Sequence, residues 1–68
     1  MCSVRITVNG QPQETAARTL AELCGALGYG DIKIATALNG DFVPAASRPS
    51  ATLSAEDRVE IVAPRQGG

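Results

Sequence analysis

Two glycines, Gly67 and Gly68, end the sequence directly behind a strand-like run and a short Pro-Arg-Gln spacer. Glycine has no Cβ, so its backbone adopts conformations closed to other residues and can approach another surface closely. A terminal Gly-Gly therefore presents an unhindered α-carboxylate that a narrow enzyme channel can admit. A frayed terminus or a cloning remnant is the alternative interpretation, so the remainder of the chain has to decide between the two.

The α-carboxylate expected at Gly68 is ionised at neutral pH, because its ordinary pKa is roughly 3.5. A carboxylate is a poor electrophile, and an adenylate formed from ATP is the obvious group that would turn it into an acyl donor. Nothing in the chain is typical of an ATP site, so a partner enzyme would have to supply this step. Pro64 to Gly68 would span roughly 17 Å when extended, enough to enter a partner's active site while the folded body docks outside.

The chain is not expected to carry out catalysis by itself. It has no histidine, which removes the usual base near neutral pH and any Ser-His or Cys-His pair. Cys2 and Cys24 lack the Cys-x-x-Cys spacing of redox and zinc sites; Cys24 is expected in the core, and a disulfide between the two is disfavoured. Glu56-Asp57 is expected to be a solvated turn, and Gly28-Tyr29-Gly30 a helix end rather than a phosphate loop. We expect no cofactor and no metal.

The composition indicates one small globular domain without a nucleic-acid or membrane surface. Hydrophobic residues make up 44% of the 68 residues and the formal net charge is −1, which excludes disorder on composition. The basic residues are spread along the chain and only Tyr29 and Phe42 are aromatic, so no phosphate-tracking or base-stacking surface is expected. No apolar run approaches a signal core or a membrane span. We therefore expect a cytoplasmic location.

The first half of the chain predicts a hairpin followed by the main helix. Residues 4–8 alternate like a half-buried strand, Asn9-Gly10 predicts a tight turn, and residues 11–15 form an edge strand because they include a proline. Thr19 and Glu22 fit a capping box at the start of a helix. Its apolar stripe consists of Leu20, Leu23, Cys24 and Leu27. Gly28 is expected to end this helix.

The second half predicts three more strands. Residues 34–38 form one of them, with Ile34, Thr36 and Leu38 on one face, and Asn39-Gly40 predicts a second hairpin leading to a short strand that ends at Pro44. Residues 45–52 are expected to be a loop with at most one helical turn, and residues 58–62 a last strand with alternate residues inward. The fold class is therefore α+β, a mixed sheet of about five strands packed on one main helix over residues 1–63. Residues 64–68 would be a flexible Gly-Gly tail.

Taken in order, these segments resemble the ThiS family, the small sulfur carriers of bacterial thiamine biosynthesis, over essentially the whole chain. The resemblance lies in the Asn9-Gly10 hairpin, Thr19-Leu20-x-Glu22-Leu23, Ala37-Leu38-Asn39-Gly40-Asp41-Phe42-Val43-Pro44, Asp57-Arg58-Val59-Glu60-Ile61 and the final Gly67-Gly68. It implies a ubiquitin-like β-grasp fold. The Ala- and Ser-rich loop over residues 45–54 departs from the family, whose members often have charged residues and a short helix there.

The resemblance also implies a function and a set of partners. A ubiquitin-activating-type adenylyltransferase (ThiF-like) would adenylate Gly68, a sulfur donor protein would supply the sulfur for a thiocarboxylate, and a thiazole synthase (ThiG-like) would receive it. Gly67 would thread the enzyme channel. Partner contacts are expected from Pro64, Arg65 and Gln66, with Arg65 either pairing with acidic residues at the channel mouth or solvating the tail. Phe42 is a further candidate for docking, against the simpler interpretation that it packs in the core.

Three alternatives remain open from the sequence. A carrier for molybdopterin or cysteine synthesis shares the fold and the tail, although such proteins tend to be longer. A ubiquitin-like protein modifier would use Gly68 to join lysines. A plain binding module would have an incidental tail.

Overall fold

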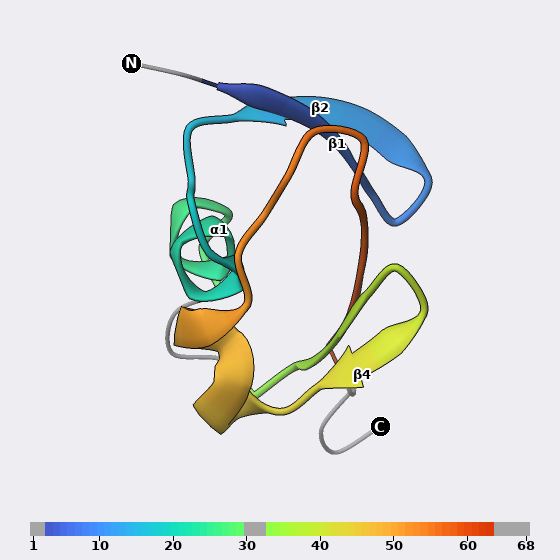
Figure 1. Ribbon diagram of the computed structural model, residues 1–68. Coiled ribbons are helices and arrows are strands. Elements are labelled where there is room, and N and C mark those ends of the chain that lie inside the picture. Colours follow the sequence, from blue (N-terminus) through green and yellow to red (C-terminus); the bar gives the residue numbers. More distant parts are fainter. Residues whose placement is uncertain (1–2, 30–32, 64–68) are drawn as a thin grey trace.

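A five-stranded mixed sheet curves around one α-helix in the computed structural model, which describes residues 3–29 and 33–63 (Figure 1). The elements in chain order are β1 (Val4–Val8), β2 (Gln11–Thr15), α1 (Leu20–Ala26), β3 (Ala35–Leu38), β4 (Asp41–Val43), the 3-10 helix η1 (Ala45–Ser50) and β5 (Arg58–Val62). The predicted α+β class and the β-grasp arrangement are confirmed. The predicted strand at 34–38 is shorter by one residue, because it starts at Ala35.

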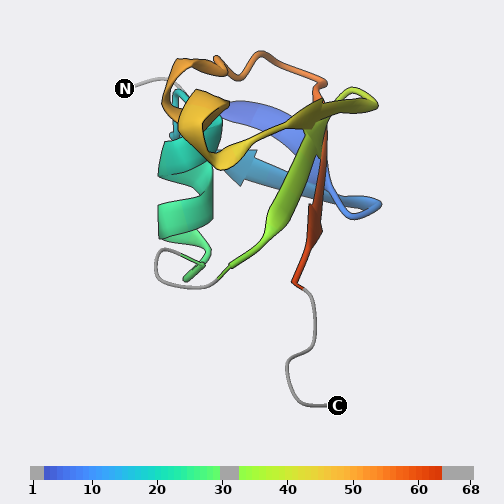
Figure 2. The same ribbon diagram turned by 90° about the horizontal axis from the view of Figure 1, so that it is seen from below.

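The sheet has the strand order β2-β1-β5-β3-β4, so the first and last strands lie side by side in its centre. β1 and β5 are parallel, and every other neighbouring pair is antiparallel. Parallel neighbours cannot be joined by a tight turn and need a long crossover. Here the connection from β1 to β5 contains β2, α1, the β3–β4 hairpin and η1. Figure 2 shows α1 and η1 on the same side of the curved sheet.

Both Asn-Gly dipeptides form the predicted hairpin turns. Asn9 and Gly10 have φ values of 51° and 84°, and Asn39 and Gly40 have 52° and 87°. Positive φ at both central residues gives a turn whose twist matches the twist of the flanking strands. Local sequence therefore determines where each hairpin reverses.

The helix begins where predicted, but its buried apolar stripe is one residue shorter than predicted. Thr19 Oγ1 accepts a hydrogen bond from the Glu22 N–H at 3.2 Å. Glu22 Oε1 accepts from the Arg18 N–H at 2.7 Å, one residue before the partner that a reciprocal capping box would use. Leu27, predicted on the buried stripe, is the C-cap after only seven helical residues and is 37% exposed. Gly28 then terminates the helix with φ of 90°.

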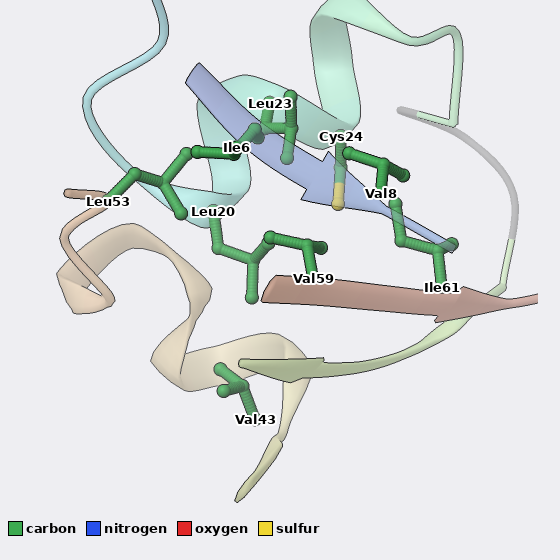
Figure 3. Packing of buried hydrophobic residues seen from close by; sticks show 9 residues of the cluster. All are labelled: Ile6, Val8, Leu20, Leu23, Cys24, Val43, Leu53, Val59 and Ile61. Atoms are coloured by element: carbon green, nitrogen blue, oxygen red, sulfur yellow. The ribbon is translucent and has the colours of Figure 1, made fainter. Parts of the chain in front are cut away.

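The core lies between the concave face of the sheet and the helix (Figure 3). Among residues 3–29 and 33–63, nine hydrophobic residues are buried in it: Ile6, Val8, Leu20, Leu23, Cys24, Val43, Leu53, Val59 and Ile61. Ile6, Leu20, Leu23 and Val59 are at most 1% exposed. They come from β1, α1 and β5, so the central parallel pair and the helix form the heart of this small core.

One buried polar network fastens η1 to the β3–β4 hairpin. Thr36, 2% exposed, donates from Oγ1 to the Val43 carbonyl at 2.8 Å. Arg48 reaches from η1 and donates from Nε to Thr36 Oγ1 at 3.0 Å and from Nη2 to the Ile34 carbonyl at 2.6 Å. Residues 45–52 were expected to be a loop with at most one helical turn, but they contain the six-residue 3-10 helix η1. Two donors fixed on one planar guanidinium hold this helix against the hairpin.

We expect Arg48→Lys to lower the free energy of unfolding by about 1–2 kcal/mol, because lysine has one nitrogen in place of the Nε and Nη2 that reach the two acceptors. Urea denaturation measures this. Arg58→Lys is the matched control: Arg58 is exposed, and its replacement should change stability by no more than about 0.5 kcal/mol. Equal effects of the two substitutions would mean that the network does not stabilise the fold.

Candidate functional site

The predicted reactive tail follows β5, and β5 is anchored on both of its edges. Val59 and Ile61 point into the core at 1% and 6% exposure, whereas Arg58, Glu60 and Val62 are exposed. This is the alternation predicted from the sequence. Gly68, Gly67, Gln66, Arg65 and Pro64, the predicted tail residues, lie outside the described residues.

The Asn9 carboxamide extends the hydrogen bonding between β1 and β5. Its Oδ1 accepts from the Ile61 N–H at 2.8 Å, and its Nδ2 donates to the Ile61 carbonyl at 3.1 Å. Asn9 was predicted only as a turn residue. The Asn-Gly signal cannot reveal this second contact, because its partner is 52 positions away in the chain.

The Asn39 carboxamide holds the opposite end of the same strand. Its Oδ1 accepts from the Arg58 N–H at 2.9 Å, and its Nδ2 donates to Asp57 Oδ1 at 3.0 Å. Asp57 Oδ2 accepts from the Ser54 N–H at 2.8 Å. The Glu56-Asp57 pair is therefore a turn, as predicted, and the Asp57 carboxylate has the structural role of capping that turn.

The outer face of the sheet has an exposed apolar patch beside the end of β5. Phe42 is 69% exposed and Val62 is 61% exposed. Ala37 is the register partner of Phe42, and Ala35 is the register partner of Val62. We call Ala35, Ala37, Phe42 and Val62 the outer patch. Directly opposed residues of neighbouring strands share a face, so these four residues lie together on the side away from the core.

The interpretation of Phe42 as a core residue is wrong. In β4 the side chains alternate, and Val43, not Phe42, faces the core at 9% exposure. A three-residue strand gives too short a pattern for the sequence to distinguish the two phases. The exposure leaves Phe42 available for a partner, as the docking interpretation requires.

Cys24 is free and buried in the core. Burial raises the pKa of the Cys24 thiol above its ordinary value of 9.0, and Arg48 opposes this with a smaller lowering effect. The thiolate is the nucleophilic form of cysteine, and a raised pKa disfavours it, so this environment is typical of a structural cysteine. The predicted core position of Cys24 is confirmed. Cys2, with which no disulfide was expected, lies outside the described residues.

The part of the chain that the structure describes holds no group of three or more His, Cys, Asp or Glu side chains placed to bind a metal. None of the helices in that part is long and apolar enough to cross a membrane. What these residues offer is a firmly held strand and an exposed apolar surface beside it.

Comparisons with known proteins agree on one family. The model of the ThiS family matches residues 6–68. The crystal structure of the thiamine biosynthesis protein ThiS from Geobacter metallireducens is similar, with a TM-score of 0.78 and 28% sequence identity. That match covers 96% of this chain and 100% of the other. No curated protein sequence matches.

The raised pKa of Cys24 predicts a loss of stability in alkali. The unfolded chain loses its thiol proton near the ordinary pKa while the folded chain keeps it, so the Cys24 contribution is complete below that pH and decreases above it. We expect the wild-type protein to be more stable than Cys24→Ala at pH 7, with a gap that narrows above pH 9.0. Urea titrations of both proteins across this range measure the gap, and a constant gap would contradict the prediction.

Proposed function

The chain belongs to the ThiS family, and we propose that it acts as a sulfur carrier of thiamine biosynthesis through a thiocarboxylate formed at Gly68. The observation that carries the proposal is the family match, which continues through Gly67 and Gly68. The 28% identical structure of a thiamine biosynthesis protein over 96% of the chain supports the same pathway. The protein is thus a co-substrate of other enzymes rather than a catalyst.

The proposed chemistry has two steps at one carboxylate. An oxygen of the Gly68 carboxylate attacks the α-phosphorus of ATP, which forms an acyl adenylate and releases pyrophosphate. A sulfide equivalent from a sulfur donor then attacks the acyl carbon, so that a C–S bond forms, the C–O bond to AMP breaks and AMP leaves. Loss of a proton gives the thiocarboxylate. Thiazole synthase (ThiG-like) is the proposed acceptor of the sulfur.

The body of the protein supports this role by anchoring the strand that precedes the tail. β5 is paired with β1 and β3, and Val59 and Ile61 are buried. From Pro64 to Gly68 the chain can span at most roughly 17 Å. An enzyme that acts on Gly68 must therefore bind close to the end of β5.

We propose the outer patch as the surface that the adenylyltransferase (ThiF-like) contacts. Val62 belongs to the last strand before the tail, and Phe42 lies on the same face two strands away. Exposed apolar side chains of this kind mark interaction sites in small soluble proteins. The exposed Arg58 and Glu60 on the same face supply a polar rim.

Deletion of Gly68 should abolish sulfur transfer without unfolding the protein, because the buried core residues that the structure describes lie between Ile6 and Ile61. The assay incubates the full-length chain or the deletion variant with ATP, a sulfide source and the activating enzyme, followed by mass spectrometry. The full-length chain should show exchange of one oxygen for sulfur at the terminus, and the variant none, with an unchanged urea midpoint. Sulfur incorporation in the variant would refute the proposal, and lysine adducts would favour a protein modifier.

Phe42→Ala should raise the KM of the activating enzyme for this protein by roughly tenfold, in the range of an aromatic hot spot. The kcat at saturation should not change, because the reacting carboxylate is untouched. Gln11→Ala, an exposed position on the far edge strand β2, is the matched control and should leave both constants unchanged. An unchanged KM for Phe42→Ala would exclude Phe42 from the docking surface.

A further inference from the structure

The geometry points to Asn9 as a positioning residue, whose carboxamide fixes the place where β5 leaves the sheet and thereby the delivery of Gly68 to the activating enzyme. This inference rests on the proposed function, because it concerns the same carboxylate. Asn9 itself touches neither ATP nor the reacting atoms.

The side chain of Asn9 takes the place of a peptide group in the parallel ladder. The ladder proceeds in steps of two: the Thr7 N–H donates to the Asp57 carbonyl and the Asn9 N–H donates to the Val59 carbonyl, each at 2.9 Å. The next partner on β5 is Ile61, but at Asn9 the backbone turns away into the hairpin with φ of 51°. The carboxamide then supplies one acceptor and one donor to Ile61, as a peptide group would.

Without the carboxamide, the end of β5 is held along one edge only. The backbone pairing of β5 with β1 extends to Val59, whereas the pairing with β3 continues to Val62. Asn9 therefore provides the hydrogen bonds that hold Ile61 from the β1 side. Strand ends with fewer partners open locally at low free-energy cost. A loose strand end would let the following residues leave the sheet in many directions.

The turn conformation alone does not explain the contact of Asn9 with Ile61, because Asn39 has the same turn conformation but contacts other residues. Asn39 has the same φ within 1° and is likewise followed by a glycine with positive φ. Its carboxamide also binds β5, but at Arg58 and Asp57, at the start of the strand. The two Asn-Gly turns thus hold opposite ends of the same strand, and only Asn9 holds the end next to the tail.

A poorly held end of β5 would lower the kcat of adenylation and leave the KM unchanged. The enzyme would still bind the folded body, but a smaller fraction of bound molecules would place Gly68 against ATP. Productive orientation of reacting groups is worth large factors in rate. The consequence is a lower kcat at saturating protein, whereas partial unfolding would raise KM and leave kcat intact, because more protein restores the folded species.

The experiment compares Asn9→Gly with Asn39→Gly in the adenylation assay. Glycine keeps the positive φ of each turn and removes only the carboxamide. We expect Asn9→Gly to lower kcat roughly tenfold with little change in KM, and Asn39→Gly to leave kcat unchanged. Amide hydrogen exchange measures the cause: the Ile61 N–H should exchange faster in Asn9→Gly and stay protected in Asn39→Gly.

The outcomes separate the two proposals. If the wild-type chain is activated and Asn9→Gly has the kcat of Asn39→Gly, the positioning role is overturned while the carrier function stands. Unchanged protection of Ile61 in Asn9→Gly would also overturn it. If the wild-type chain is not adenylated at all, the proposed function is wrong and the positioning role falls with it.

Discussion

The parallel pairing of β1 with β5 is the constraint on which the rest of the structure depends. It places the last strand between two neighbours in the centre of the sheet, where the strand's own Val59 is buried in the core at 1% exposure. Parallel strands require a crossover, and this crossover supplies the helix, the second hairpin and η1. The last strand before the tail is therefore a central strand of the sheet, which suits a protein proposed to present its last residues to enzymes.

The two faces and the two edges of β5 make different contacts. Its inner side chains belong to the core, and Val62 on its outer side belongs to the outer patch. Along its edges, backbone pairing is completed by two asparagine carboxamides, one at each end. The chain has 68 residues, and nine hydrophobic residues are buried in the part that the structure describes. The side-chain hydrogen bonds and the Arg48 network supplement this core, which is small for independent folding.

Much of the fold and of the proposed chemistry could be predicted from the residues. The two Asn-Gly turns, the Thr19 cap and the alternation of β5 all depend on neighbours in the sequence, and each was found where predicted. The family match leaves the thiamine pathway favoured over the molybdopterin, cysteine and protein-modifier alternatives. Two interpretations were wrong: Leu27 on the buried stripe, at the end of a short helix, and Phe42 in the core, in a three-residue strand. There the hydrophobic pattern is too brief to define a face.

The sequence by itself determined the turns, the start of the helix, the class of the fold and the carboxylate chemistry expected at Gly68, because backbone conformation and reactive groups are local properties. Only the tertiary structure decided the strand order, the exposure of Phe42 and the partners of Arg48. It also showed that Asn9, predicted only as a turn residue, forms hydrogen bonds with Ile61. These features depend on contacts between residues far apart in the chain, and such contacts exist only once the long crossover has brought the first and last strands together.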